Sequence, residues 1–144
     1  MDNVKIAVID GLGGGLGSQI INNVKDILNK SIEIIALGAN FEATSRLINE
    51  FANRGATGEN AIKFTVKKVD IILGPIGIIV PNSMSGEITP AIAEAVASCS
   101  AEKYLIGIRQ SHFKLIGLKD NSINDLIDDL MEELEENIDN DFLI

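Results

Sequence analysis

The chain of 144 residues has a single cysteine, Cys99, and a single histidine, His112. One cysteine excludes an internal disulfide and a cluster of thiolate metal ligands. Because Cys99 lies on a predicted helix of small residues, the pattern favours a packed core thiol over a nucleophile. His112 lies in a predicted surface turn without a second histidine, so neither a zinc site nor a nucleophilic triad can be assembled. The lone cysteine and the lone histidine therefore supply no catalytic residue and no metal ligand.

Long apolar runs are also missing. Glycine, proline and polar residues interrupt the best candidate, residues 71–84, so it is too short to span a membrane. The N-terminus has no basic region followed by an apolar signal core. We expect a single domain, residues 1–144, in the cytoplasm, with no membrane partner.

Positive charge is scarce toward the C-terminus. Of the 21 acidic residues, ten lie at or after position 120, where no lysine or arginine occurs; this leaves 12 basic and 11 acidic residues, a net charge of +1, in the rest of the chain. Binding to a nucleic acid backbone needs a basic patch. The adjacent Lys67 and Lys68 form a pair and not a patch, so nucleic acid is not expected as a partner.

What the chain does contain is a glycine-rich turn. The apolar run Val4–Ile9 and Asp10 are followed by five glycines in seven positions, and an amphipathic segment begins at Ser18. The glycines are Gly11, Gly13, Gly14, Gly15 and Gly17. Glycine lets backbone amides approach a ligand closely, and a helix N-terminus attracts anions. The segment therefore predicts a strand, a turn and a helix that bind a phosphate, in preference to a turn that serves only helix packing. Asp10 is expected either to brace the turn or to contact the ligand.

The spacing of these glycines narrows the choice of cofactor. The dinucleotide motif G-x-G-x-x-G fails because Leu16 stands where its third glycine would be. The spacing G-x-x-x-G-x-G through Gly11, Gly15 and Gly17 resembles the corresponding loop of short-chain dehydrogenases. A P-loop is excluded because no G-K-[ST] closes the turn. NAD(P) or a mononucleotide is therefore the candidate cofactor, and its identity stays open.

Other loops are expected at the same edge of the sheet. In the turn after the second predicted strand, Asn40 can bond a ribose hydroxyl, and Arg46 or Arg54 can meet an additional phosphate. Glu59 is a candidate acid, base or magnesium ligand. A later polar loop either contributes to the site or is simply a solvated loop with a helix cap; its candidates are Asn82, Ser83 and Glu87.

Alternating apolar patterns predict the remaining elements. Strands are expected at residues 4–9, 32–37, 70–73, 103–108 and 113–118, and helices after the glycines and at 43–52, 91–99 and 122–138. Gly55 is expected to cap the second helix at its C-terminus, and Thr89 with Pro90 to start the third. Residues 56–69 fit a short helix or a strand, and residues 70–80 fit one strand or two.

Alternation of buried strands and helices predicts an α/β fold, a Rossmann-like three-layer sandwich with a mostly parallel sheet of about five strands. Ligands bind such sheets at the carboxyl ends of the strands, where the strand order reverses.

The last predicted helix, residues 122–138, is acidic and amphipathic. Its apolar stripe must be buried, either on the chain's own sheet, which is favoured, or across the axis of a homodimer. The stripe consists of Ile123, Leu126, Ile127, Leu130, Met131, Leu134 and Ile138.

Three strings resemble a small bacterial family known only as a domain of unknown function. They are VIDGLGGGLG at residues 8–17, NRGATGENAI at 53–62 and GPIGIIVPNSMSGEITP at 74–90. The resemblance covers nearly the full length, agrees with a Rossmann-like fold and implies no activity.

The resemblance to short-chain dehydrogenases stops at the first loop. Those enzymes use a Tyr-x-x-x-Lys pair, whereas here Tyr104 is followed by Ile108. The leading hypothesis is a Rossmann-like protein that binds a phosphate-containing ligand on the glycine turn, with no reaction assigned. The alternatives are a structural or regulatory homo-oligomer without enzymatic activity, and an NAD(P)-dependent oxidoreductase that lacks the usual pair.

Overall fold

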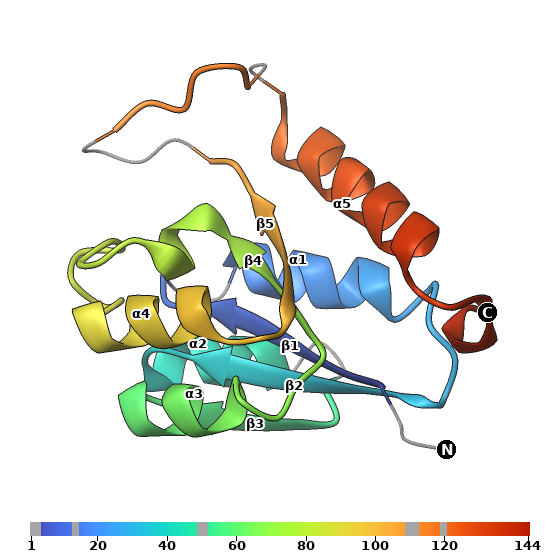
Figure 1. Cartoon of the computed structure of the whole chain (residues 1–144), viewed down its shortest axis with the longest axis horizontal. Coiled ribbons are helices and arrows are strands. Elements are labelled where there is room, and N and C mark those ends of the chain that lie inside the picture. Colours follow the sequence, from blue (N-terminus) through green and yellow to red (C-terminus); the bar gives the residue numbers. More distant parts are fainter. Residues whose placement is uncertain (1–3, 13–14, 49–51, 109–112, 119–120) are drawn as a thin grey trace.

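The computed structural model describes residues 4–12, 15–48, 52–108, 113–118 and 121–144 (Figure 1). Five strands form one sheet in the order β3-β2-β1-β4-β5, and each neighbouring pair is parallel. They are β1 (Val4–Asp10), β2 (Ile32–Gly38), β3 (Arg54–Thr57), β4 (Ile71–Pro75) and β5 (Glu102–Ile106). The strand order reverses between β1 and β4, so the carboxyl ends of these two strands mark the edge where such folds bind ligands.

Helices cover both faces of the sheet. One face packs against α1 (Gly15–Val24), α2 (Phe41–Ile48) and α5 (Ile123–Asn137), and the other against α3 (Glu59–Thr65), the 3-10 helix η1 (Ile76–Ile79) and α4 (Pro90–Ser98). The side chains of β1 alternate between the two cores: Ile6 and Val8 lie in the first, and Ala7 and Ile9 in the second. The predicted Rossmann-like sandwich with a parallel sheet of about five strands is confirmed.

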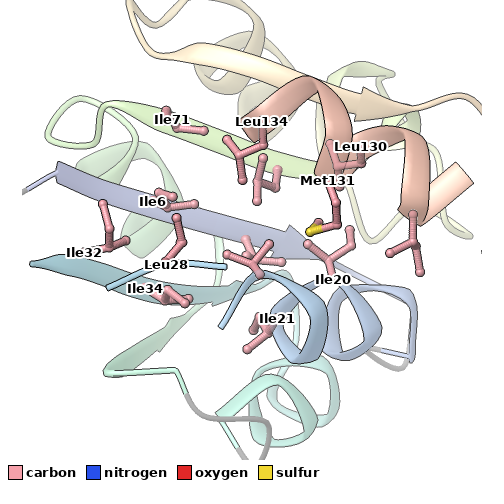
Figure 2. Close-up of a cluster of buried hydrophobic side chains, with 14 of the residues drawn as sticks. Ile6, Ile20, Ile21, Leu28, Ile32, Ile34, Ile71, Leu130, Met131 and Leu134 are labelled. Carbon is pink, nitrogen blue, oxygen red and sulfur yellow. The ribbon is translucent and has the colours of Figure 1, made fainter. Parts of the chain in front are cut away.

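The acidic helix α5 packs on the chain's own sheet. Leu130, Met131 and Leu134 are buried in the same core as Ile20 of α1 and Ile71 of β4 (Figure 2). The Ser122 hydroxyl caps the helix by accepting a hydrogen bond from the Asp125 amide at 3.2 Å, as the sequence predicts. Most of the apolar stripe is thus buried within the chain, as the favoured sequence interpretation predicts, while Leu126 is half-buried and Ile123 is exposed.

The chain end returns to the loop that follows α1. A short 3-10 helix, η2 (Asn140–Phe142), comes after α5. The Asn29 amide donates to the Phe142 carbonyl at 3.0 Å, and the Ile144 amide donates to the Ile27 carbonyl at 2.9 Å. No helix among the described ranges is both long and apolar enough to cross a membrane.

The sequence interpretation was wrong at the third strand. Residues 54–57 form β3, so Gly55 is a strand residue and not a helix cap. A Cβ at Gly55 would lie 2.6 Å from Ile48 Cδ1, and the glycine therefore allows α2 to pack closely on this edge strand. The ambiguous stretch that follows contains the short helix α3.

The structure also decides two other segments. Residues 70–80, for which the sequence allowed one strand or two, contain one strand, β4, after which the apolar run turns into η1, where Ile78 is buried in the core. Pro75 has no amide hydrogen to continue the sheet ladder, which favours this change. Residues 113–118 form no strand; instead Leu118 packs against Gly107, beyond the end of β5.

Candidate functional site at the carboxyl edge of the sheet

Asp10 braces the glycine turn from inside. Its side chain is 3% exposed, and Oδ1 accepts hydrogen bonds from the amides of Gly11 at 2.7 Å and Leu12 at 3.2 Å. Oδ2 accepts a third from the Gly17 amide at 2.9 Å. A carboxylate near a helix N-terminus is stabilised by the helix dipole as well as by these donors. Of the two roles expected for Asp10, the structure shows the brace.

Asn40 is a second brace. Its Nδ2 donates to the Gly11 carbonyl at 2.9 Å, and its Oδ1 accepts from the Ala43 amide at 2.9 Å, so the same side chain caps α2 and holds the turn after β1. The turns after β1 and β2 are therefore fixed to one another. Leu12 follows Gly11 in the chain, and Phe41 follows Asn40. Both of these large apolar side chains are exposed, Leu12 at 65% and Phe41 at 78%.

Arg46 approaches the start of α1. Its Nη1 lies 3.7 Å from the position that a Cβ on Gly15 would take, which is ordinary contact distance. By contrast, a Cβ on Gly17 would lie 2.5 Å from Leu47 Cδ2 and 3.2 Å from the Asp10 carboxylate. Gly17 thus serves packing, whereas Gly15 leaves space in front of a guanidinium group.

The crevice at the reversal of strand order is filled by the chain itself. A Cβ on Gly11 would lie 3.1 Å from Met84 Sδ and 3.2 Å from Ile88 Cδ1. Met84 belongs to a left-handed turn in which Met84, Ser85 and Gly86 have φ of 56°, 57° and 85°. Such backbone is unfavourable for residues other than glycine, at about 1–2 kcal/mol each. The second loop therefore covers the glycine turn instead of opening a cleft beside it.

The polar candidates of this second loop have different surroundings. Ser83 is 2% exposed, and its hydroxyl donates to the Gly77 carbonyl at 2.5 Å, which makes it a structural residue of the loop. Asn82 and Glu87 are exposed, and the Asn82 backbone has φ of 63°. The backbone amide of Asn82 donates to the Ile88 carbonyl at 2.7 Å and closes the loop.

Glu59 and Thr89 meet where α3 and α4 begin. The Thr89 hydroxyl donates to Glu59 Oε1 at 2.5 Å and accepts from the Ile92 amide at 3.2 Å, so it is also the N-cap of α4 predicted from the sequence. No group of three or more His, Cys, Asp or Glu residues placed to hold a metal ion occurs in the described part of the chain.

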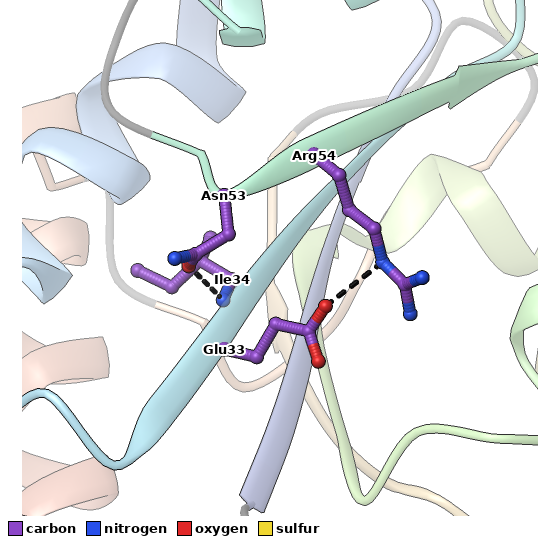
Figure 3. A network of polar contacts seen from close by, with 4 residues as sticks. All are labelled: Glu33, Ile34, Asn53 and Arg54. Atoms are coloured by element: carbon purple, nitrogen blue, oxygen red, sulfur yellow. Dashed lines mark hydrogen bonds and ion pairs between the residues drawn. The ribbon is translucent and has the colours of Figure 1, made fainter.

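Arg54 does not join this edge. It lies level with Ile35 in the sheet, three residues before the level of Asp10 and Gly38. Its Nε is 2.9 Å from Glu33 Oε1, near the start of β2 (Figure 3). The remaining sequence candidates, Gly13 and Gly14, lie outside the described residues, as does His112.

The structure also identifies features that the sequence did not single out. The exposure of Leu12 and Phe41 and the placement of Met84 over Gly11 depend on contacts between distant segments. Phe41 directly follows the predicted Gly38–Asn40 turn, and an aromatic residue beside a turn was the signal that could have suggested an exposed ring.

Comparison with known proteins identifies the family. A family model matches residues 5–139, almost the whole chain. The chain belongs to the DUF3842 family, a domain of unknown function. No curated protein matches the DUF3842 chain.

Matching solved structures include that of a universal stress protein in complex with cAMP. It is 15% identical, with a TM-score of 0.44, and the match covers 74% of the DUF3842 chain and 98% of that protein. Identity at this level does not transfer a ligand.

Proposed function

We propose that this DUF3842 protein binds a mononucleotide, or another small phosphate-containing molecule, against the first turn of α1. The observation that carries the proposal is the position of the Arg46 guanidinium beside Gly15. The first amides of a helix have no partner within the helix and attract anions. A cation and helix amides thus face the same space, which suits a phosphate group.

Asp10 determines which amides take part. Because its carboxylate already accepts from Gly11, Leu12 and Gly17, the phosphate is assigned to the amides of Gly15 and Leu16 in the same turn. The negative charge of Asp10 is stabilised by its three amide donors and is buried. The ligand would lie on the side of the turn that faces α2.

Leu12 and Phe41 supply an apolar rim for the rest of the ligand. They adjoin the Asn40–Gly11 hydrogen bond on the two turns and are exposed. A nucleobase can bury such apolar surface, and stacking on an aromatic ring adds to the binding energy. A base on this rim and a phosphate near Gly15 would be held by neighbouring segments.

A mononucleotide is favoured over NAD(P) because of Met84 and Ile88. Dinucleotides lie across the reversal of strand order in Rossmann folds. Here both side chains would contact a Cβ at Gly11 at that position. The proposal includes binding only and assigns no reaction; the cytoplasmic location expected from the sequence is retained with it.

The test is a melting-temperature screen with adenine and guanine mononucleotides and NAD. A compound that binds the folded protein raises the melting temperature in proportion to the logarithm of its concentration. We expect a mononucleotide to do so, and Gly15→Val to abolish the rise because its side chain fills the space in front of Arg46.

Arg46→Gln should weaken the same ligand about ten-fold, since a hydrogen bond to a charged group contributes about 1.5–3 kcal/mol. Lys63→Gln is the matched control, because it removes one exposed positive charge on the opposite face of the sheet. A wild-type protein that no compound stabilises at millimolar concentration contradicts the proposal, as does an equal effect of the two variants.

A further inference from the structure

A pocket lies on the face of the sheet that carries α3, away from the glycine turn. Helix α3 has seven residues and spans about 10 Å, whereas the seven residues of β2 span about 23 Å. The short helix therefore covers only part of the length of β2. A pocket of about 440 Å³ remains there, lined by Lys5, Ile35, Arg54, Ala56, Phe64 and Lys68 among others.

Three cations from three different elements line this pocket. Lys5 comes from β1, Arg54 from β3 and Lys68 from the segment after α3. From the sequence, Lys67 and Lys68 were interpreted as an isolated pair. The fold places Lys68 near Lys5 and Arg54, which are distant in the chain. This clustering is notable in a protein whose net charge is −9.

The nearby carboxylates leave donors available. Glu33 binds Arg54 through Nε, and the contact drawn in Figure 3 runs to this nitrogen and to neither terminal nitrogen of the guanidinium. Asp70 accepts a hydrogen bond from the Lys5 backbone amide at 2.9 Å. Both acids thus already have partners, while Arg54 can still offer its planar pair of terminal nitrogens to an anion.

The pocket also has an aromatic wall and an apolar floor. Phe64 is 60% exposed, and Lys68 Nζ lies 3.8 Å from the centre of its ring. Ile35, which is 2% exposed, and the half-buried Ala56 form the floor. A planar ring bound here would cover Phe64 while a charged substituent met the cations.

From these observations we propose that the pocket binds a small anion that carries an aromatic ring, such as an aryl phosphate or an aryl carboxylate. Its volume falls within the range of about 300–1,000 Å³ typical of small-molecule sites. The acidic helix of a second copy is a poorer occupant, because a helix about 10–12 Å in diameter does not enter a pocket of this size.

This pocket is separate from the proposed nucleotide site. Arg54 lies three strand residues, about 10 Å, before the level of Asp10. The pocket also opens on the face of α3, whereas Gly15 and Arg46 lie on the face of α1 and α2. Ligands at the two sites are therefore distinguished by which backbone amides they shift.

The experiment is an NMR titration of the full chain with phenyl phosphate, benzoate, inorganic phosphate and phenol. We expect saturable shifts at the amides of Ala56, Ala61 and Thr65 with phenyl phosphate or benzoate in the low millimolar range. Inorganic phosphate and phenol should each bind more weakly, because phosphate has no aromatic ring and phenol has no anionic group. The stronger of the two aryl anions identifies the charged group.

Matched variants test the assignment. Lys68→Gln should weaken the aryl anion about five-fold, and Phe64→Leu should weaken it while leaving inorganic phosphate unchanged. Lys67→Gln, which removes a neighbouring charge that does not line the pocket, should change binding less than about two-fold. Circular dichroism confirms that the variants fold.

Three outcomes would overturn the inference. The first is the lack of saturable shifts around Ala56 and Thr65 with either aryl anion. Another is an equal loss of binding in Lys67→Gln and Lys68→Gln, which would indicate general charge attraction. Shifts confined to Gly15 and Leu16 would place the anion in the nucleotide site instead.

Discussion

Oδ2 of Asp10, at the end of β1, lies 2.9 Å from the backbone nitrogen of Gly17 in α1, so the strand and the helix are tied across the glycine turn by one buried carboxylate. The same carboxylate holds the amides of Gly11 and Leu12. The Asp10 carboxylate therefore occupies backbone amides of the glycine turn that the sequence analysis would assign to a bound phosphate. The shape of the turn is set by the chain itself, and a ligand is left with the donors farther along α1.

Replacing this carboxylate should destabilise the fold. Asp10→Asn keeps one side-chain oxygen as an acceptor but replaces the other with an NH2 group, which cannot accept a hydrogen bond. At least one of the buried backbone amides that Asp10 binds would then have no partner. We expect a loss of about 1–3 kcal/mol in the free energy of unfolding, measured by urea denaturation. Glu42→Gln, at an exposed position in the first turn of α2, should change it by less than about 0.5 kcal/mol. Equal stability of Asp10→Asn and the wild type would contradict the brace.

Two glycines of the same turn should respond differently to alanine. A Cβ at Gly17 would meet Leu47 at 2.5 Å in a fully buried site, so Gly17→Ala should cost about 1–3 kcal/mol through overpacking. Gly15→Ala places its methyl at 3.7 Å from the flexible Arg46 and should change stability by less than about 1 kcal/mol. Thermal unfolding of both variants checks the difference. A larger loss at Gly15 than at Gly17 would show that the packing of α1 on α2 is wrong.

Helix α5 should be required for folding. Five of its apolar side chains are buried, namely Ile127, Leu130, Met131, Leu134 and the capping residue Ile138. At about 1.5–3 kcal/mol each, their burial contributes roughly as much as the whole stability of a typical domain. Deletion of residues 122–144 should therefore give an insoluble or molten product.

A point variant tests the packing of the same helix without removing the helix. Leu134→Ala should cost about 2–5 kcal/mol, whereas Glu135→Ala, on the exposed side of the helix, should cost less than about 1 kcal/mol. A soluble truncated protein with native near-UV circular dichroism would contradict the packing of α5 on its own sheet.

Tyr104 should titrate at an unusually high pH. Burial, followed by the hydrogen bond from its hydroxyl to Glu102 at 2.9 Å, raises its pKa from 10.0 to about 12. Because the folded protein holds the phenolic proton more tightly than the unfolded chain, this contribution to stability is complete below pH 10 and is lost as the pH rises toward 12. The effect is small, since the ring is partly solvated.

The titration can be followed directly, because Tyr104 is the one tyrosine and the chain has no tryptophan. Ultraviolet absorbance of the tyrosinate should show a midpoint near 12 in the folded protein. Glu102→Gln should lower the midpoint by removing the carboxylate, and Tyr104→Phe should make stability less dependent on pH above 10. A midpoint of 10 in the folded wild type would contradict the hydrogen-bonded arrangement.

Much of the architecture was predictable from the sequence because its signals are local. The apolar run of β1, the glycines and the amphipathic α1 follow one another directly, and hydrogen bonds in a helix or turn join nearby residues. Thr89 with Pro90, and Ser122, marked helix starts that the structure confirms through their capping hydrogen bonds. Once strands and helices alternate, a parallel sheet in three layers follows from burial and connection rules.

The sequence by itself thus determined the fold class, the glycine turn and the acidic helix. Only the tertiary structure decided that the four residues of β3 form an edge strand, since Arg54–Thr57 has no apolar pattern and is held by pairing with β2. It also decided that Met84 covers Gly11 and that Arg46 stands beside Gly15. These placements depend on contacts between residues about 30 to 70 positions apart, and residue spacing along the chain does not encode which distant side chain fills a given space.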